Sequence, residues 1–213
     1  MKYHTLPSLM WIIFKPSFEK ELTNTFAYDE KDARTITAKA KLKYKEIISS
    51  IPEFEKKDRF KMNIVSASML SAFVLSLHKR PDVETLTIYY RKAMMTKLMK
   101  KFCRIKAKKK FSKLDIELMK KTEQLKAANR NLYSWNMEFY PYSDDSGYEA
   151  RFTKCGICTL TKRLNLFDLT PALCELDYTM SQEGGCSEFI RKYTLASGGP
   201  YCDCGYKKLS TLK

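Results

Sequence analysis

The chain has 213 residues, of which 44% are hydrophobic and 13% aromatic, enough to build a packed core and too many for a disordered chain. Lys and Arg total 39 against 24 Asp and Glu, a net charge of +15, which raises nucleic acid or an anionic membrane as partners. Residues 91–113 hold eleven basic and no acidic residues, so most of the excess belongs to one segment. No zinc-finger spacing, aromatic RNA-binding motif or helix-turn-helix accompanies this segment. We therefore interpret it as a solvated lysine face and do not favour nucleic-acid binding.

Membrane insertion and secretion are not predicted. The longest apolar stretch, residues 64–77, is interrupted by serines and ends before His78-Lys79-Arg80, short of the roughly 20 residues that a span requires. The first residues show no small-residue cleavage site. Seven cysteines are an odd number in a chain of this size, which favours reduced thiols. We expect a cytoplasmic protein without a membrane partner.

The first part of the chain is predicted to be helical. All seven glycines lie between Gly147 and Gly205, and apolar residues recur at helical spacing in the earlier part. After Pro81-Asp82, which suits a helix start, one apolar stripe continues to Phe102. The expected helices cover residues 17–26, 33–49, 62–78, 82–102 and 112–129.

The last third is predicted to contain strands. Residues 132–142 alternate aromatic and polar side chains, residues 143–147 form a turn, and residues 148–155 follow as a second strand of a hairpin. Short helices are expected at 157–165 and 171–181, the second capped by Thr170, with further strands on either side of Gly198-Gly199. We therefore expect an α+β fold in one domain, residues 1–213, with a mainly helical half (1–130) packed on a small antiparallel sheet in the Cys/Gly-rich half (131–213).

Cysteine chemistry is one candidate function of the C-terminal half. Six cysteines gather there, including the pairs Cys155-x2-Cys158 and Cys202-x-Cys204, and such thiolates could bind zinc. We interpret Cys202 and Cys204 as pointing to opposite faces of a strand, so that they would not hold one ion together. No cofactor is predicted beyond this zinc hypothesis. Only two histidines exist, both in the helical half, which does not support a Cys–His nucleophile.

The last third resembles a known enzyme family. The sequence CELDY at residues 174–178 and FIRKYTLASGGPYCDC at residues 189–204, together with Cys155, resemble the L-2-amino-thiazoline-4-carboxylic acid hydrolase family. The stretch MLSAFVLSLHKRPDVETLTIYYRKAM resembles the middle region of that family, and the similarity extends over about residues 30–207. This chain departs from the family pattern at Cys204, where the family has Phe, and in the pairing of Cys155 with Cys158.

The resemblance implies hydrolytic opening of a 2-aminothiazoline-4-carboxylate ring to a carbamoyl-cysteine, a step of cysteine metabolism. It places Cys202, Asp203, Asp177 and Cys174 at the matching positions as catalytic candidates. A carboxylate could activate the water and hold the amidine group, or a Cys202 thiolate could attack the ring. Arg191 and Arg151 are candidates for binding the substrate carboxylate.

A second class of function stays open at this point. The same scaffold could be a non-catalytic domain that binds a small ligand or a metal, or that senses redox state through its cysteines. The expected partner is a small carboxylate substrate, and the sequence does not indicate an oligomeric state.

Overall fold

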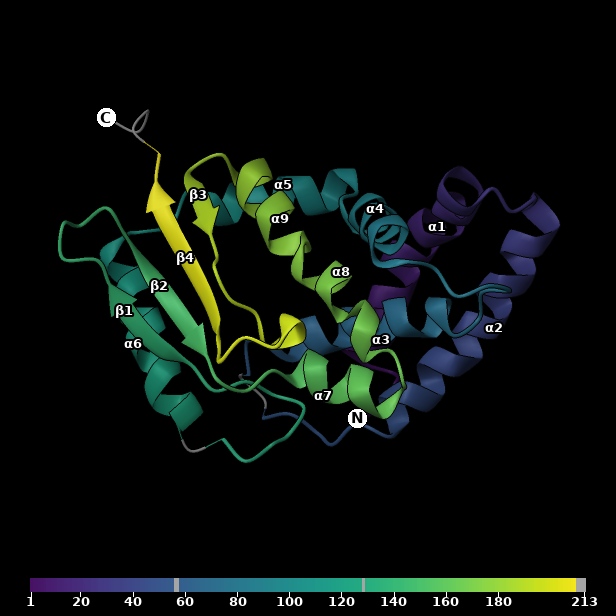
Figure 1. Cartoon of the computed structure of the whole chain (residues 1–213), viewed down its shortest axis with the longest axis horizontal. Helices are drawn as coiled ribbons and strands as arrows, with labels where there is room; N and C mark the ends of the chain where they lie inside the picture. Colours follow the sequence, from purple (N-terminus) through teal and green to yellow (C-terminus); the bar gives the residue numbers. More distant parts are fainter. Residues whose placement is uncertain (56–57, 128, 210–213) are drawn as a thin grey trace.

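The computed structural model describes residues 1–55, 58–127 and 129–209. Its N-terminal part is helical (Figure 1). The helices of this part are α1 (Leu6–Phe26), α2 (Glu30–Ser49), α3 (Lys61–Val74), α4 (Val83–Met94), α5 (Lys97–Ala107) and α6 (Lys113–Ala127). Side chains of Asp29, Asp82 and Thr96 cap α2, α4 and α5 by accepting a backbone N–H two or three residues into each helix. The expected helical half is thereby confirmed, and residue 128 of the expected helix 112–129 lies outside the described residues.

The C-terminal part combines a sheet with short helices. Its elements are β1 (Glu138–Pro141), β2 (Gly147–Phe152), α7 (Gly156–Arg163), α8 (Thr170–Cys174), α9 (Leu176–Gly184), β3 (Ser187–Ile190) and β4 (Cys202–Lys208), with 3-10 turns at Phe167–Leu169 and Leu195–Ser197. The strands form an antiparallel sheet in the order β1-β2-β4-β3. This arrangement confirms the α+β fold class.

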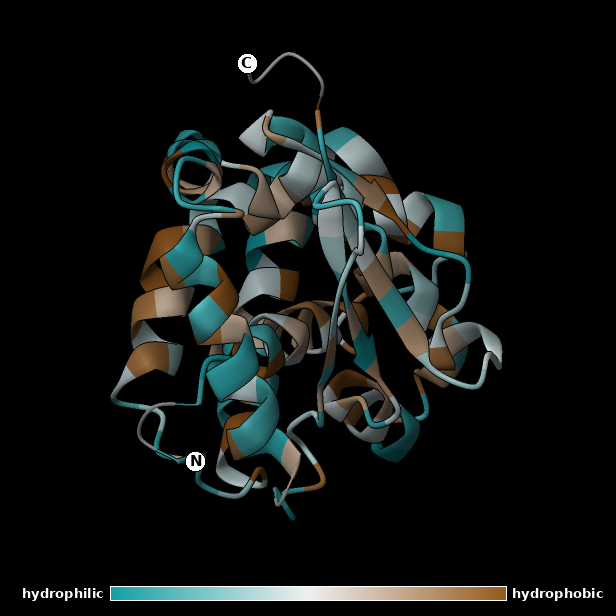
Figure 2. Cartoon of the chain, turned by 90° about the vertical axis from the view of Figure 1, so that its left-hand side faces the viewer, coloured by the Kyte–Doolittle hydropathy of each residue, from teal (hydrophilic) through white to brown (hydrophobic). Residues whose placement is uncertain are grey.

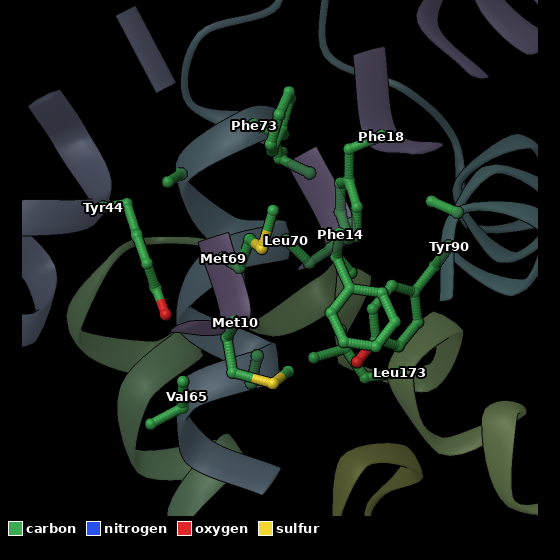
Figure 3. Close-up of a cluster of buried hydrophobic side chains, with 14 of the residues drawn as sticks. Met10, Phe14, Phe18, Tyr44, Val65, Met69, Leu70, Phe73, Tyr90 and Leu173 are labelled. Atoms are coloured by element: carbon green, nitrogen blue, oxygen red, sulfur yellow. The ribbon is translucent and has the colours of Figure 1, made fainter. Parts of the chain in front are cut away.

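A core of apolar side chains holds the N-terminal helices together. Phe18, Tyr44 and Phe73 are fully buried between α1, α2 and α3 and lie close together with Met10 and Met69 (Figure 3). Aromatic contacts link the helices, because the Phe18 ring lies 4.9 Å from that of Phe73. Figure 2 shows brown and teal residues side by side along single helices, the alternation that lets one face of each helix be buried.

A smaller cluster joins the sheet to α6. Met119 of α6 packs against Phe139 of β1 and against Tyr148 and Ala150 of β2. Helix α9 packs against both α5 and β3, so that α5, α6 and α9 surround the inner face of the sheet. This inner face is the one that carries Tyr148, Ala150 and their cross-strand partners on β4, Tyr206 and Cys204.

Three local predictions were wrong. The apolar stripe from 86 to 102 does not form one helix, because the chain breaks at Met95 and Thr96 caps a new helix. The first strand begins at Glu138 rather than at 132, since the preceding residues form turns and loops. Thr170 lies inside α8 and does not cap it, and the helix expected over 171–181 is divided between Cys174 and Leu176.

Within the part of the chain that the structure describes, no helix has both the length and the apolar character needed to cross a bilayer.

Candidate active site

A cavity of about 210 Å³ lies between α5, α9 and the inner face of the sheet. It is smaller than the roughly 300–1,000 Å³ of sites for drug-sized ligands, so it suits a small molecule. Aromatic and small side chains form much of its wall, and several polar groups open into it. Those used below are Lys110, Asp115, Tyr148, Asp177 and Tyr206.

Asp177 is the carboxylate that the structure pairs with a buried cation. It lies in the first turn of α9, where the unpaired N–H groups of a helix favour negative charge. The guanidinium of Arg191, just after β3, donates from Nη1 to Asp177 Oδ2 at 3.1 Å. Its Nη2 donates to the carbonyl of Cys174 at 3.0 Å and contacts Glu175 at 3.4 Å. Arg191 therefore ties the end of α8 to the start of α9 and orients Asp177.

The two partners differ in their exposure. The Arg191 side chain is 5% exposed and does not line the cavity, whereas the Asp177 side chain is 46% exposed and does. Although part of the Asp177 side chain is exposed, the surrounding protein desolvates its carboxylate and raises its pKa, and the positive charge of Arg191 opposes that shift. A carboxylate that faces a cavity and whose pKa is raised is a candidate general base.

Lys110 supplies a cation to the same cavity. It lies in the turn between α5 and α6, and its Nζ is 3.1 Å from the centroid of the Tyr206 ring. Burial lowers the pKa of Lys110 to about 8, against the opposing effect of nearby Cys186, Asp115 and Asp177. Phe111, the next residue, has a left-handed backbone with φ 64°, and its N–H donates to Asp115 at 2.9 Å, which fixes the turn that presents Lys110.

Arg151 and Asp203, both predicted site residues, lie on the other face of the sheet. They are cross-strand partners, and each is three positions from a tyrosine of the inner face, Tyr148 or Tyr206. Arg151 pairs with Glu149 at 2.8 Å and stacks on Tyr201. Both Asp203 oxygens accept backbone N–H groups, at 2.9 Å from Lys192 and 2.6 Å from Tyr193. Asp203 thus holds the segment after β3 against β4.

The cysteines of β4 share the inner face. Cys202 and Cys204 pair with Phe152 and Ala150 of β2. The interpretation that their sulfurs point to opposite faces is wrong, because side chains two apart in a strand point the same way. Burial raises the pKa of Cys202, although the Leu195 N–H donates to its sulfur at 3.2 Å and lowers it. Burial likewise raises the pKa of Cys204 and of Cys174. Each of these groups is a thiol at neutral pH.

Cys155 and Cys158 form a separate pair at the start of α7. Cys155 is the N-cap residue, and Gly156 after it lies so close to the Tyr133 carbonyl that an added Cβ would be 2.0 Å from that oxygen. The Cys158 thiol, the N–H groups of Cys158 and Ile157 and the Trp135 indole lower the pKa of Cys155 against the opposing effect of burial.

All seven cysteines are free thiols. Among residues 1–55, 58–127 and 129–209, no three His, Cys, Asp or Glu side chains are grouped so that they could hold a metal ion. The zinc hypothesis therefore gains no support from the arrangement of the cysteines.

Of the predicted site residues, the structure brings together Asp177, Arg191 and Cys174, and it places Cys202 on the same face of the sheet as the cavity. Sequence reasoning missed Lys110, which is one of eleven cations in residues 91–113 and carries no motif of its own. It also missed Tyr206, whose ring contacts Lys110. Neither the burial of one lysine nor its contact with a distant strand is visible in the sequence.

Comparison with known proteins identifies the family. The family model for L-2-amino-thiazoline-4-carboxylic acid hydrolase matches residues 62–206, more than half of the chain and the part that contains Lys110, Asp177, Arg191 and Tyr206. No curated protein and no solved structure matches the chain significantly. The chain therefore belongs to the L-2-amino-thiazoline-4-carboxylic acid hydrolase family.

Proposed function

We propose that this protein hydrolyses a small cyclic amidine that carries a carboxylate, of the 2-aminothiazoline-4-carboxylate type, in the cavity between α5, α9 and the sheet. Family membership supports a hydrolase acting on a small molecule. The observation that carries the proposal is the Asp177 carboxylate, held by buried Arg191 and facing a cavity that also contains the Lys110 cation.

Substrate binding follows from the charges of the cavity. Lys106 and Lys110 both line it, and Lys110, in the turn after α5, is the more buried of the two, so its ammonium pairs with the substrate carboxylate. The flat ring of the substrate packs on the Tyr206 and Tyr148 side chains that form the sheet wall. Arg191, with donors committed to Asp177 and the Cys174 carbonyl, acts as a positioning residue and not as the carboxylate partner.

Asp177 is the proposed general base. Arg191 contacts its Oδ2, and within the described residues Oδ1 accepts no hydrogen bond, which leaves that oxygen for a water molecule. Asp177 removes a proton as the water oxygen bonds to C2 of the ring. The C2–S bond then breaks as the C2 hydroxyl becomes a carbonyl; Asp177 returns its proton to the departing sulfur, and the hydroxyl proton passes to the ring nitrogen, whose double bond to C2 was lost when the water added. One water is consumed, and the product is the carbamoyl-cysteine, with a free thiol and a new carbonyl at C2.

Attack by a cysteine is the competing mechanism. Cys202 and Cys174 do not line the cavity, and burial raises the pKa of each, which disfavours the nucleophilic thiolate. Asp203 is engaged by two backbone N–H groups on the far face of the sheet. The contacts therefore favour Asp177 over the other three catalytic candidates.

A non-catalytic redox-sensing function is the second candidate. The observation in its favour is the Cys155–Cys158 pair, whose first thiol has a lowered pKa at the start of α7. This function needs no turnover of a thiazoline and requires only reversible oxidation of the pair.

The decisive experiment incubates the protein with L-2-amino-thiazoline-4-carboxylate and follows the carbamoyl-cysteine by mass spectrometry. We expect turnover, and a loss of about 100-fold or more in kcat for Asp177→Asn. Glu175→Gln is the matched control, because Glu175 also contacts Arg191 but does not line the cavity. Absence of turnover by the wild-type protein would reject the proposed substrate, and full activity of Asp177→Asn with loss in Cys202→Ser would transfer the chemistry to the cysteine.

A further inference from the structure

Helix α5 exposes an apolar stripe to solvent. Leu98, Phe102 and Ile105 are 58%, 37% and 48% exposed, while Met99 and Cys103 are the buried residues of this helix. The exposed three are spaced i, i+4 and i+7, so they lie along one face of the helix. Their face is turned well away from the face that Met99 and Cys103 bury.

Cations border the stripe on both sides. At 100° per residue, Lys97, Lys101 and Lys108 lie along one edge and Lys106 along the other. The Lys106 Nζ lies 5.4 Å from the centroid of the Phe102 ring, which places this charge directly beside the apolar side chains. We call Leu98, Phe102, Ile105 and these four lysines the α5 face.

Few acidic groups compensate this charge. Glu183 of α9 contacts Lys100 and Arg104, on the side of α5 that meets α9. Within the described residues, Lys97, Lys101, Lys106 and Lys108 form no salt bridge, and residues 91–113 contain no Asp or Glu. The α5 face therefore combines unneutralised positive charge with exposed aliphatic and aromatic surface.

The combination of positive charge and exposed apolar surface indicates which kind of partner the α5 face binds. A second copy of the same face would bring two sets of lysines together, which repel each other. A nucleic acid would use the lysines but leave Leu98 and Ile105 without an apolar environment, because phosphates dominate such contacts. An anionic bilayer satisfies both, since its phosphate groups attract the lysines and its acyl region accepts the apolar side chains.

We propose that the α5 face docks on the surface of an anionic membrane, with α5 parallel to the bilayer plane. The absence of a spanning helix does not bear on this contact, because a surface helix inserts only its apolar side chains. Phe102 and Lys106 also line the cavity. The docked face therefore borders the proposed substrate site.

Sedimentation with lipid vesicles tests the proposal on the full chain. We expect binding to phosphatidylcholine vesicles that contain about one third phosphatidylglycerol, and little binding to pure phosphatidylcholine. Lys97→Gln, Lys101→Gln and Lys108→Gln together should weaken binding on the order of 100-fold, at about 1 kcal/mol for each lysine. Leu98→Ser with Ile105→Ser should weaken it by about tenfold or more at unchanged charge.

Leu42→Ser on α2 is the matched control. Leu42 is 69% exposed and lies among Lys39, Lys41 and Lys43, so this variant removes an exposed leucine from another basic helix. It should bind vesicles like the wild type, and thermal unfolding followed by circular dichroism confirms that each variant is folded. Three results would overturn the proposal: no binding of the wild type to anionic vesicles, unchanged binding of the Leu98/Ile105 variant, or binding to duplex DNA but not to vesicles.

Discussion

The buried guanidinium of Arg191 donates a hydrogen bond from Nη1 to Oδ2 of Asp177 at 3.1 Å, so that a buried cation orients a carboxylate that lines the cavity. The contact joins the residue that follows β3 to the first turn of α9 and acts on the pKa of the proposed base. Burial raises the pKa of Asp177, and the positive charge of Arg191 lowers it.

Arg191→Gln should move the acid limb of the activity profile to higher pH. Without the guanidinium, burial and the nearby Glu175 raise the pKa of Asp177 with only Lys110 opposing them, so the pKa rises further and the base is protonated over a wider range. We expect the acid limb of kcat/KM to shift upward by about one pH unit. Arg191→Lys keeps the charge and should shift the limb less. An unshifted limb in Arg191→Gln would show that another group titrates there.

Lys110 should control the alkaline limb. Its pKa of about 8 means that the ammonium is lost as pH rises through that value, and with it the partner of the substrate carboxylate. We expect kcat/KM to fall about tenfold for each pH unit above this pKa. Lys110→Arg should remove the fall because guanidinium stays protonated, whereas Lys110→Met should raise KM at neutral pH. Lys109→Met, a change of the exposed neighbour, is the control and should leave the profile intact.

Cys155 should react with iodoacetamide faster than the other half-buried cysteines. Its thiolate is stabilised by the Cys158 thiol, by N–H groups at the start of α7 and by the Trp135 indole. Cys202 is similarly exposed, but burial raises its pKa. Peptide mass mapping after brief alkylation at neutral pH should find label at Cys155 first, and Trp135→Phe should slow the labelling. Equal rates at both cysteines would contradict the thiolate at Cys155.

The sequence allowed the layers of the fold to be predicted better than their junctions. The helical spacing of apolar residues predicted the helices, and the SDDSG sequence predicted the turn of the β1–β2 hairpin. The break between α4 and α5 was not visible, because Met95 and Thr96 are residues that a helix tolerates and only the Thr96 cap reveals it. The alternating aromatic and polar residues before Glu138 are not part of a strand, and only the end of that alternating segment, Glu138–Pro141, forms β1.

The predicted site residues that meet in the structure lie within the segments 174–178 and 189–204 that resemble the family. Asp177 and Arg191 lie in the two motif segments and meet in the structure. Arg151 and Asp203 lie in the same region, but strand alternation turns them to the face opposite Tyr148 and Tyr206, and that alternation was readable from the sequence. Lys110 was hidden in a run of similar residues, since its burial depends on Tyr206, nearly one hundred residues away.

A buried ion pair should make the helical part sensitive to one substitution. Lys126 of α6 donates to Asp58, and Ser134 donates to the same carboxylate at 2.8 Å. The side chains of Lys126 and Asp58 are 5% and 1% exposed. Lys126→Met removes the cation and leaves the Asp58 charge buried without its counter-ion, which should lower the free energy of unfolding by about 3–5 kcal/mol.

The double variant separates this charge effect from simple loss of packing. Asp58→Asn removes the buried negative charge. In the wild type the Phe60 N–H donates to the Asp58 carboxylate at 2.9 Å, and the amide oxygen of the new asparagine can accept the same hydrogen bond. Lys126→Met with Asp58→Asn should therefore recover more than half of the loss, as measured by urea unfolding at neutral pH. If the double variant were as unstable as Lys126→Met alone, the stability would come from other contacts of the Lys126 side chain, such as that of its Nζ with the Phe60 ring at 5.3 Å from the centroid, and not from the ion pair.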